Sequence, residues 1–170
     1  RRDELTQVRA GLDAAIEAGF SGIKLDTVLV RGVNDHEIGP MLDFARTLGA
    51  EVRLIEYMDV GGATRWSPEQ VVSRAQVLAQ VAALRGVPVA LADRGSAPAE
   101  RFVLPDGQRF GVIASTTQPF CGACDRARLS ADGNLFTCLY AARGTDVKAW
   151  LRSGMTDEAI VLGLERTWRD

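Results

Sequence analysis

The sequence predicts an α/β fold up to residue 92, followed by a smaller antiparallel α+β domain over residues 93–170. The first part is predicted by two strand patterns, at 23–30 and 52–58, with apolar residues at helical spacing between them. The distance between the strands fits one βα unit with parallel strands. The second part is predicted by a change after Asp93, where Gly, Ser and Pro become frequent and short strands flank tight turns.

The helices are predicted from apolar residues that recur at helical spacing. The first covers residues 2–18, and the second follows a turn at which Asn34 or Asp35 is expected to act as the cap. The third is expected to start at Ser67, because a cap residue, a proline and a glutamine follow one another in the order typical of a helix start. Two closing helices are predicted over residues 145–152 and 156–168.

The strand at 23–30 carries charges on one face. Lys24 and Asp26 share that face, whereas Ile23 and Leu25 share the other. Charged residues are unusual in a sheet that is buried on both faces. The pattern fits an edge strand with a solvated face, or a barrel strand whose polar face lines a ligand-filled lumen, and it does not decide between them.

Three further short strands are predicted at 87–91, 101–104 and 109–113, the last two joined by a turn around Asp106-Gly107. With a hairpin that follows Cys124, the last two are expected to form one small antiparallel sheet. A loop is predicted at 61–64.

The composition limits the classes of protein to which the chain can belong. It is 46% hydrophobic and 25% charged, as in ordinary globular proteins, and its net charge of −2 gives no basic surface typical of nucleic-acid binding. No apolar run approaches the ~18 residues of a transmembrane helix, and no signal peptide is visible. The odd number of cysteines, 3, argues against a secreted disulfide scaffold. We therefore expect a cytoplasmic protein without nucleic-acid or membrane partners.

The three cysteines lie close together in the sequence. Cys121 and Cys124 form a C-x-x-C motif, and a predicted β-hairpin with a two-residue turn at Asp132-Gly133 leads back to Cys138. This register would place Cys138 across from Ala127. The third thiolate would then return to the first two, and we expect these residues to bind a metal centre.

The cysteine pattern alone leaves several interpretations open. A structural zinc site takes four ligands, whereas a four-iron cluster can leave one iron open, and a C-x-x-C motif also suits a redox dithiol or a disulfide. The only histidine, His36, is far away in the sequence. Arg126 and Arg128 would face the same side as Cys124 in an extended chain, which favours anion binding but also fits a solvated strand face.

Several ordered motifs carry a resemblance to a known family. They are Gly-Ile-Lys-Leu-Asp-Thr-Val-Leu-Val-Arg-Gly-Val-Asn-Asp-His-Glu, Pro-Ala-Glu-Arg-Phe, Phe-Gly-Val-Ile-Ala-Ser and Pro-Phe-Cys-Gly-Ala-Cys-Asp-Arg-Ala-Arg-Leu-Ser-Ala-Asp-Gly. Together they resemble the C-terminal part of the MoaA family of radical-SAM enzymes, the GTP 3′,8-cyclases of molybdenum cofactor biosynthesis. The similarity covers essentially the whole chain.

The resemblance implies a fold and a set of site residues. Residues 1–92 would be the last βα units of an incomplete TIM-type barrel, and residues 93–170 an iron–sulfur domain. The metal ligands of a [4Fe-4S] cluster would be Cys121, Cys124 and Cys138. The residues that match GTP-binding positions are Lys24, Arg126, Ala127 and Arg128, and Met58 matches a position that contacts S-adenosylmethionine.

The resemblance also implies an activity. The family converts GTP to (8S)-3′,8-cyclo-7,8-dihydroguanosine 5′-triphosphate by S-adenosylmethionine radical chemistry, which makes it a lyase. A second [4Fe-4S] cluster, bound by a C-x-x-x-C-x-x-C motif, generates the radical, and that motif is absent from these 170 residues. We therefore expect the substrate-binding C-terminal part of the enzyme, inactive alone, with GTP and a second copy of the chain, in a homodimer, as partners. The alternative is a non-catalytic Fe–S or zinc-binding module.

Overall fold

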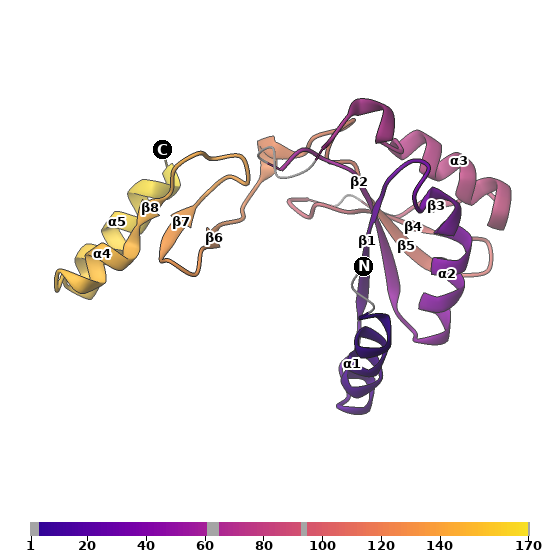
Figure 1. The fold of residues 1–170 in the computed structure, drawn as a ribbon, viewed down its shortest axis with the longest axis horizontal. Coiled ribbons are helices and arrows are strands. Elements are labelled where there is room, and N and C mark those ends of the chain that lie inside the picture. Colours follow the sequence, from indigo (N-terminus) through magenta and orange to yellow (C-terminus); the bar gives the residue numbers. More distant parts are fainter. Residues whose placement is uncertain (1–3, 61–64, 93–94, 170) are drawn as a thin grey trace. The chain divides into compact units, whose positions relative to one another are not determined.

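The computed structural model describes residues 4–60, 65–92 and 95–169, which form two compact units. Of these residues, the first unit contains 4–58, 66–92 and 95–122, and the second contains 59–60, 65 and 123–169. The loop predicted at 61–64 and the change predicted at Asp93 lie outside the described residues. The α/β class is confirmed, because the first unit has a mixed five-stranded sheet with helices and the second has a three-stranded antiparallel sheet (Figure 1).

The first sheet has the strand order β1-β2-β5-β4-β3. Three neighbouring strands run parallel: β1 (Lys24–Leu29), β2 (Glu51–Glu56) and β5 (Arg109–Ile113). The parallel pairing of β1 with β2 is the one expected for a βα unit. Two antiparallel strands complete it, β4 (Glu100–Val103) and β3 (Val89–Ala90).

The prediction that the strands at 101–104 and 109–113 pair with the cysteine hairpin is wrong. β5 pairs with β2 instead, because Phe110 and Val112 lie beside Val52 and Leu54 and continue the apolar face of the sheet. The second unit contains the chain from Ala123 onward, in addition to residues 59–60 and 65, whereas the division into domains at residues 92 and 93 stays a prediction.

The core of the first unit lies between one face of this sheet and two helices, α2 (Ile38–Thr47) and α3 (Arg74–Arg85). Alternation explains which face is buried, since residues two apart on a strand point to the same side. The core residues include Leu29, Val52, Leu54, Phe110 and Val112 from the strands and Ile38, Leu42, Val77 and Val81 from the helices. The remaining helix of this unit, α1 (Leu5–Glu17), has no buried residue, and its Arg9 stacks on the ring of Phe44 at 5.6 Å.

The starts of α2 and α3 differ from those predicted. Ser73 rather than Ser67 caps α3: its hydroxyl accepts from the Gln76 N–H, and the Gln76 side chain accepts from the Ser73 N–H at 3.0 Å. Ser67 precedes a separate 3-10 turn, η2 (Pro68–Gln70). A further 3-10 turn, η1 (Asp35–Glu37), leads into α2, and the Asn34 side chain accepts from the Val30 N–H instead of capping a helix.

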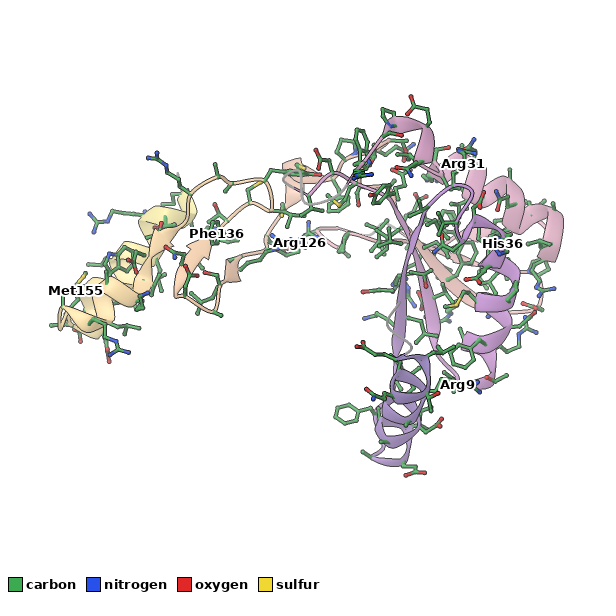
Figure 2. The ribbon with its side chains drawn as sticks, viewed as in Figure 1. Arg9, Arg31, His36, Arg126, Phe136 and Met155 are labelled. Carbon is green, nitrogen blue, oxygen red and sulfur yellow. The ribbon has the colours of Figure 1, made fainter. Side chains whose placement is uncertain are left out.

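The loop after β1 is fastened to the segment before α3. Val30 forms a β-bridge with Val71, and Arg31 donates through its guanidinium to the carbonyls of Glu69 at 2.9 Å and Val71 at 2.7 Å (Figure 2). These bonds hold two loops together at the end of the sheet where β1 and β2 finish. His36 in the neighbouring turn is exposed, as expected for a polar residue at the start of a helix.

The second unit begins with strands β6 (Arg128–Leu129), β7 (Asn134–Phe136) and β8 (Thr145–Asp146), followed by helices α4 (Val147–Arg152) and α5 (Asp157–Arg169). Asp146 caps α4, and Thr156 accepts from the Ala159 N–H at the start of α5 as predicted. Gly163 of α5 lies against the Trp150 ring, which packs the two helices together. Within the described part of the chain, no helix has the length and apolar character needed to span a membrane.

Candidate functional site

The polar face of the first sheet carries the first group of candidate residues. Because the helices cover the opposite face, the side chains of Lys24 on β1, Arg53 on β2 and Arg101 on β4 lie on the uncovered side. An open pocket of about 720 Å³ lies there, and its charged lining residues are Lys24, Arg46, Glu51, Arg53, Arg101, Asp106 and Arg109. Five of these are basic and two acidic, so the pocket favours an anion.

β1 is an edge strand of the described sheet, and its exposed Lys24 lines this pocket. Both interpretations of this strand, an edge strand with a solvated face and a barrel strand that lines a ligand-filled lumen, stay predictions. Met58 is half-buried and lies two positions beyond the last residue of β2. It is therefore at the other end of β2 from Glu51, which lines the pocket.

Glu51 organises the basic side chains of the pocket. Its carboxylate accepts from Arg101 Nη2 at 2.8 Å and Nε at 3.2 Å, and it also pairs with Arg53. Burial alone would raise the pKa of Glu51, but the hydrogen bond from Arg101 and the charge of Arg53 outweigh it and hold that pKa below its usual range. Arg53 is only 6% exposed, and its side chain lies across Gly111.

The cysteines are divided between the two units. Cys121 lies in a 3-10 turn, η3 (Cys121–Ala123), at the end of the first unit, and Cys124 and Cys138 lie in the second. All three are free and exposed. Among the described residues, no three His, Cys, Asp or Glu side chains form a group that could hold a metal ion. The predicted convergence of the three thiolates therefore stays a prediction, while the donor chemistry of three free thiols fits an iron–sulfur cluster.

The cysteine hairpin has a different register from that predicted. Arg128 pairs with Phe136 and Leu129 with Leu135, and residues 131–133 form the loop. The Ser130 N–H donates to the Asn134 carbonyl at 2.9 Å, and the Ser130 hydroxyl accepts from the Asn134 N–H at 3.1 Å, so this pair closes the loop one residue earlier than a turn of Asp132-Gly133 would. The pairing ends at Arg128 and Phe136, so the described ladder does not extend to the predicted pair of Ala127 and Cys138.

Two arginines lie beside the cysteines of the second unit. Arg126 Nη2 donates to Cys124 Sγ at 3.2 Å (Figure 2), and the Arg126 backbone N–H together with this guanidinium lowers the pKa of the Cys124 thiol. Arg128 and Cys138 line one open pocket of about 350 Å³, together with Phe136 and Ser130. The structure thus brings each arginine near one cysteine. For Arg126 this cysteine is Cys124, and the spacing of these two residues predicted that they face the same side.

Glu56 is a residue that the sequence reasoning missed. It lies at the end of β2, is only 1% exposed, and its carboxylate binds backbone N–H groups of two other segments. The signal was present, because Glu56 continues the alternation of Val52 and Leu54 onto the buried face. A charged residue at a core position of a strand is rare unless it has partners.

These features define an α/β protein whose sheet carries a basic pocket and whose following unit carries cysteines beside arginines. A family model described as Molybdenum Cofactor Synthesis C matches residues 50–170. The chain therefore belongs to the molybdenum cofactor synthesis family.

Curated relatives match nearly the whole chain. It is 49% identical over 164 residues to "GTP 3',8-cyclase 3" of Mycobacterium bovis, with 96% of this chain and 43% of the relative covered. It is 46% identical to "GTP 3',8-cyclase 1" of Mycobacterium tuberculosis, covering 99% and 47%, and 43% identical to the "GTP 3',8-cyclase" of Streptomyces coelicolor, covering 99% and 49%. The chain thus spans about half the length of the relatives that it matches.

Proposed function

We propose that this chain is the substrate-binding C-terminal part of a GTP 3′,8-cyclase, a lyase that converts GTP to (8S)-3′,8-cyclo-7,8-dihydroguanosine 5′-triphosphate. The observation that carries the proposal is the alignment with relatives of that name over 96% of the chain or more. We place the protein in the cytoplasm and include a homodimer in the proposal.

The proposed metal ligands are Cys121, Cys124 and Cys138, which are free thiols. A [4Fe-4S] cluster with three cysteine ligands supplies an iron that can accept an electron pair from a further ligand. The chain's own contribution is to present the thiolates and to place hydrogen-bond donors beside them. Arg126 already donates to Cys124, and the Tyr140 N–H donates to Cys138 Sγ at 3.4 Å. We propose S-adenosylmethionine as the second cofactor of the whole enzyme, with Met58 among its contacts.

The proposed GTP contacts are Lys24, Arg126, Ala127 and Arg128. Lys24 lies in a pocket with more basic than acidic side chains, and Arg128 lines the pocket that contains Cys138. Guanidinium groups suit phosphate because they donate two parallel hydrogen bonds to its oxygens. These residues would bind and orient GTP, which is the main task that the protein performs when cofactors carry out the chemistry.

The test uses the full-length protein, reconstituted with iron and sulfide under anaerobic conditions. We expect it to convert GTP to an isomer of the same mass when S-adenosylmethionine and a reductant are present, with release of 5′-deoxyadenosine. Omission of S-adenosylmethionine is the control and should abolish the product. A protein that binds one zinc and no iron, and leaves GTP unchanged, would contradict the proposal and support the alternative of a non-catalytic zinc-binding module.

A further inference from the structure

We infer that Glu56 is a positioning residue, which fixes the turn at Thr116–Thr117 and thereby holds the chain segment that presents Cys121 as a metal ligand. This inference rests on the proposed function only in taking Cys121 to be a metal ligand. The contacts of Glu56 are independent of it.

Each carboxylate oxygen of Glu56 accepts two hydrogen bonds. One oxygen, Oε2, accepts from the backbone N–H groups of Thr116 at 2.9 Å and Thr117 at 2.7 Å. The other, Oε1, accepts from the Thr117 hydroxyl at 2.5 Å and from the Arg74 N–H at 2.7 Å. Four donors match the acceptor capacity of one carboxylate.

The Arg74 contact explains how a charge is tolerated at a position that is only 1% exposed. Arg74 is the first residue of α3, and its N–H is one of the donors that a helix start leaves without a partner inside the helix. The positive end of the helix dipole also stabilises the carboxylate. Glu56 therefore lies between a fixed helix start and the turn at Thr116–Thr117.

The turn at Thr116–Thr117 donates three hydrogen bonds to this carboxylate, whereas its own backbone closes it with a single longer one, from the Gln118 N–H to the Ala114 carbonyl at 3.3 Å. Both threonines are exposed, although their N–H groups bind a buried oxygen. Thr116 also donates through its hydroxyl to the Tyr57 carbonyl at 3.1 Å, so a second bond comes from the residue next to Glu56. The end of β2 thus holds the turn from two adjacent positions.

Cys121 follows Thr117 after a short tether. Gln118, Pro119 and Phe120 are the only residues between them, and Cys121 belongs to the same compact unit as Glu56. A short chain that leaves a fixed point can explore little space, so fixing Thr117 restricts where the Cys121 thiol can lie. A valine or leucine at position 56 would fill the core but would leave three backbone donors without this acceptor.

The experiment compares Glu56→Gln, Thr117→Val and Thr117→Ser in the full-length protein. The matched control is Asp43→Asn, which alters an exposed carboxylate that pairs with Arg85 in the same unit. Hydrogen exchange at the amides of Thr116 and Thr117 reports the turn. The rate at which a chelator removes iron reports how firmly Cys121 and the other proposed ligands hold the cluster. It is measured in a variant in which the cysteines of the C-x-x-x-C-x-x-C motif are replaced by alanine. That background leaves only the proposed cluster of this chain.

We expect Glu56→Gln to speed both amide exchange and iron release by about tenfold, the effect of losing a typical hydrogen bond to a charged group. Thr117→Val should have a smaller effect in the same direction, and Thr117→Ser, which keeps the hydroxyl, should restore the original rates. Asp43→Asn should leave the Thr116 and Thr117 amides and iron release unchanged. If Glu56→Gln fails to fold, the two Thr117 variants decide.

Faster exchange with unchanged iron release would overturn the inference, since Glu56 would then only stabilise the fold. Unchanged exchange would overturn it too, because the turn would not depend on the carboxylate. If the unmodified protein holds zinc, the proposed function fails, and the inference about Glu56 is decided by the same release measurement with zinc. A protein that binds neither metal overturns both.

Discussion

The carboxylate of Glu51 on β2 accepts hydrogen bonds from the guanidinium of Arg101 on β4, although β5 lies between the two strands. Gly111 on β5 makes this contact possible. It pairs with Arg53 on one side and with Arg101 on the other, and the Arg53 side chain lies over it. The three charged side chains on the polar face therefore depend on a glycine in the strand between them.

We predict that Gly111→Ala destabilises the first unit. A β-carbon at this position would lie 2.8 Å from Arg53 Cδ, which is closer than carbon atoms approach without a shift in structure. Overpacking of this kind costs about 1–3 kcal/mol, and urea unfolding measures it. Gly11→Ala is the control, because a β-carbon on α1 has no neighbour within 4 Å. Equal effects of the two substitutions would show that the contact with Arg53 does not limit position 111.

We predict that Glu51 makes stability depend on pH in the acidic range. Burial raises the pKa of Glu51, but Arg101 and Arg53 together lower it by a larger amount. The folded-state pKa therefore lies below the ordinary 4.5. A carboxylate whose pKa is lower in the folded state stabilises the fold at pH values above its unfolded-state pKa. This contribution disappears as the pH falls through the folded-state pKa. The free energy of unfolding of the unmodified protein should therefore exceed that of Glu51→Gln at pH 7, and the difference should shrink below about pH 4.5. A difference that stays constant down to pH 3 would contradict this.

Local patterns in the sequence predicted the elements of the first unit well. The strand predicted at 109–113 has the bounds of β5, and the alternation at Lys24–Leu29 appears as exposed and covered positions in turn. Local patterns suffice there because a strand with one covered face must place apolar residues at every second position.

The partners of these elements could not be predicted in the same way. The pairing of β2 with β5 joins segments far apart in the chain, and no local pattern records it. The hairpin register depended on one side chain, Ser130, which competes with the Asp132-Gly133 turn for the Asn134 backbone. The start of α3 had two competing caps, and the hydrogen bond between Ser73 and Gln76 decided between them.

We predict that Ser73→Ala weakens the first unit and that Ser67→Ala has a smaller effect. Ser73 forms a reciprocal capping box with Gln76, whereas the Ser67 side chain makes no capping hydrogen bond to η2. Loss of a helix cap typically costs about 1 kcal/mol. Thermal unfolding of the two variants, side by side, measures the difference. A larger loss from Ser67→Ala would show that the helix start depends on η2 and not on the capping box.

We predict that Arg128→Ala weakens GTP binding without loss of iron. Arg128 is exposed and lines the pocket that contains Cys138, so its guanidinium is available to a phosphate group. A hydrogen bond to a charged group contributes about 1.5–3 kcal/mol, which corresponds to roughly a tenfold to hundredfold change in affinity. Titration of the reconstituted full-length protein with GTP, together with iron analysis, measures both quantities.

Arg126 would be a poorer choice for this test, because it also donates to Cys124 Sγ, and its removal would change a metal ligand as well as the anion site. Arg152→Ala, in the last turn of α4, is the matched control for a loss of positive charge in the same unit and should bind GTP normally. Cys138→Ala should instead lose iron. If Arg128→Ala binds GTP as tightly as the unmodified protein, with full iron content, Arg128 belongs to a solvated strand face and not to the nucleotide site.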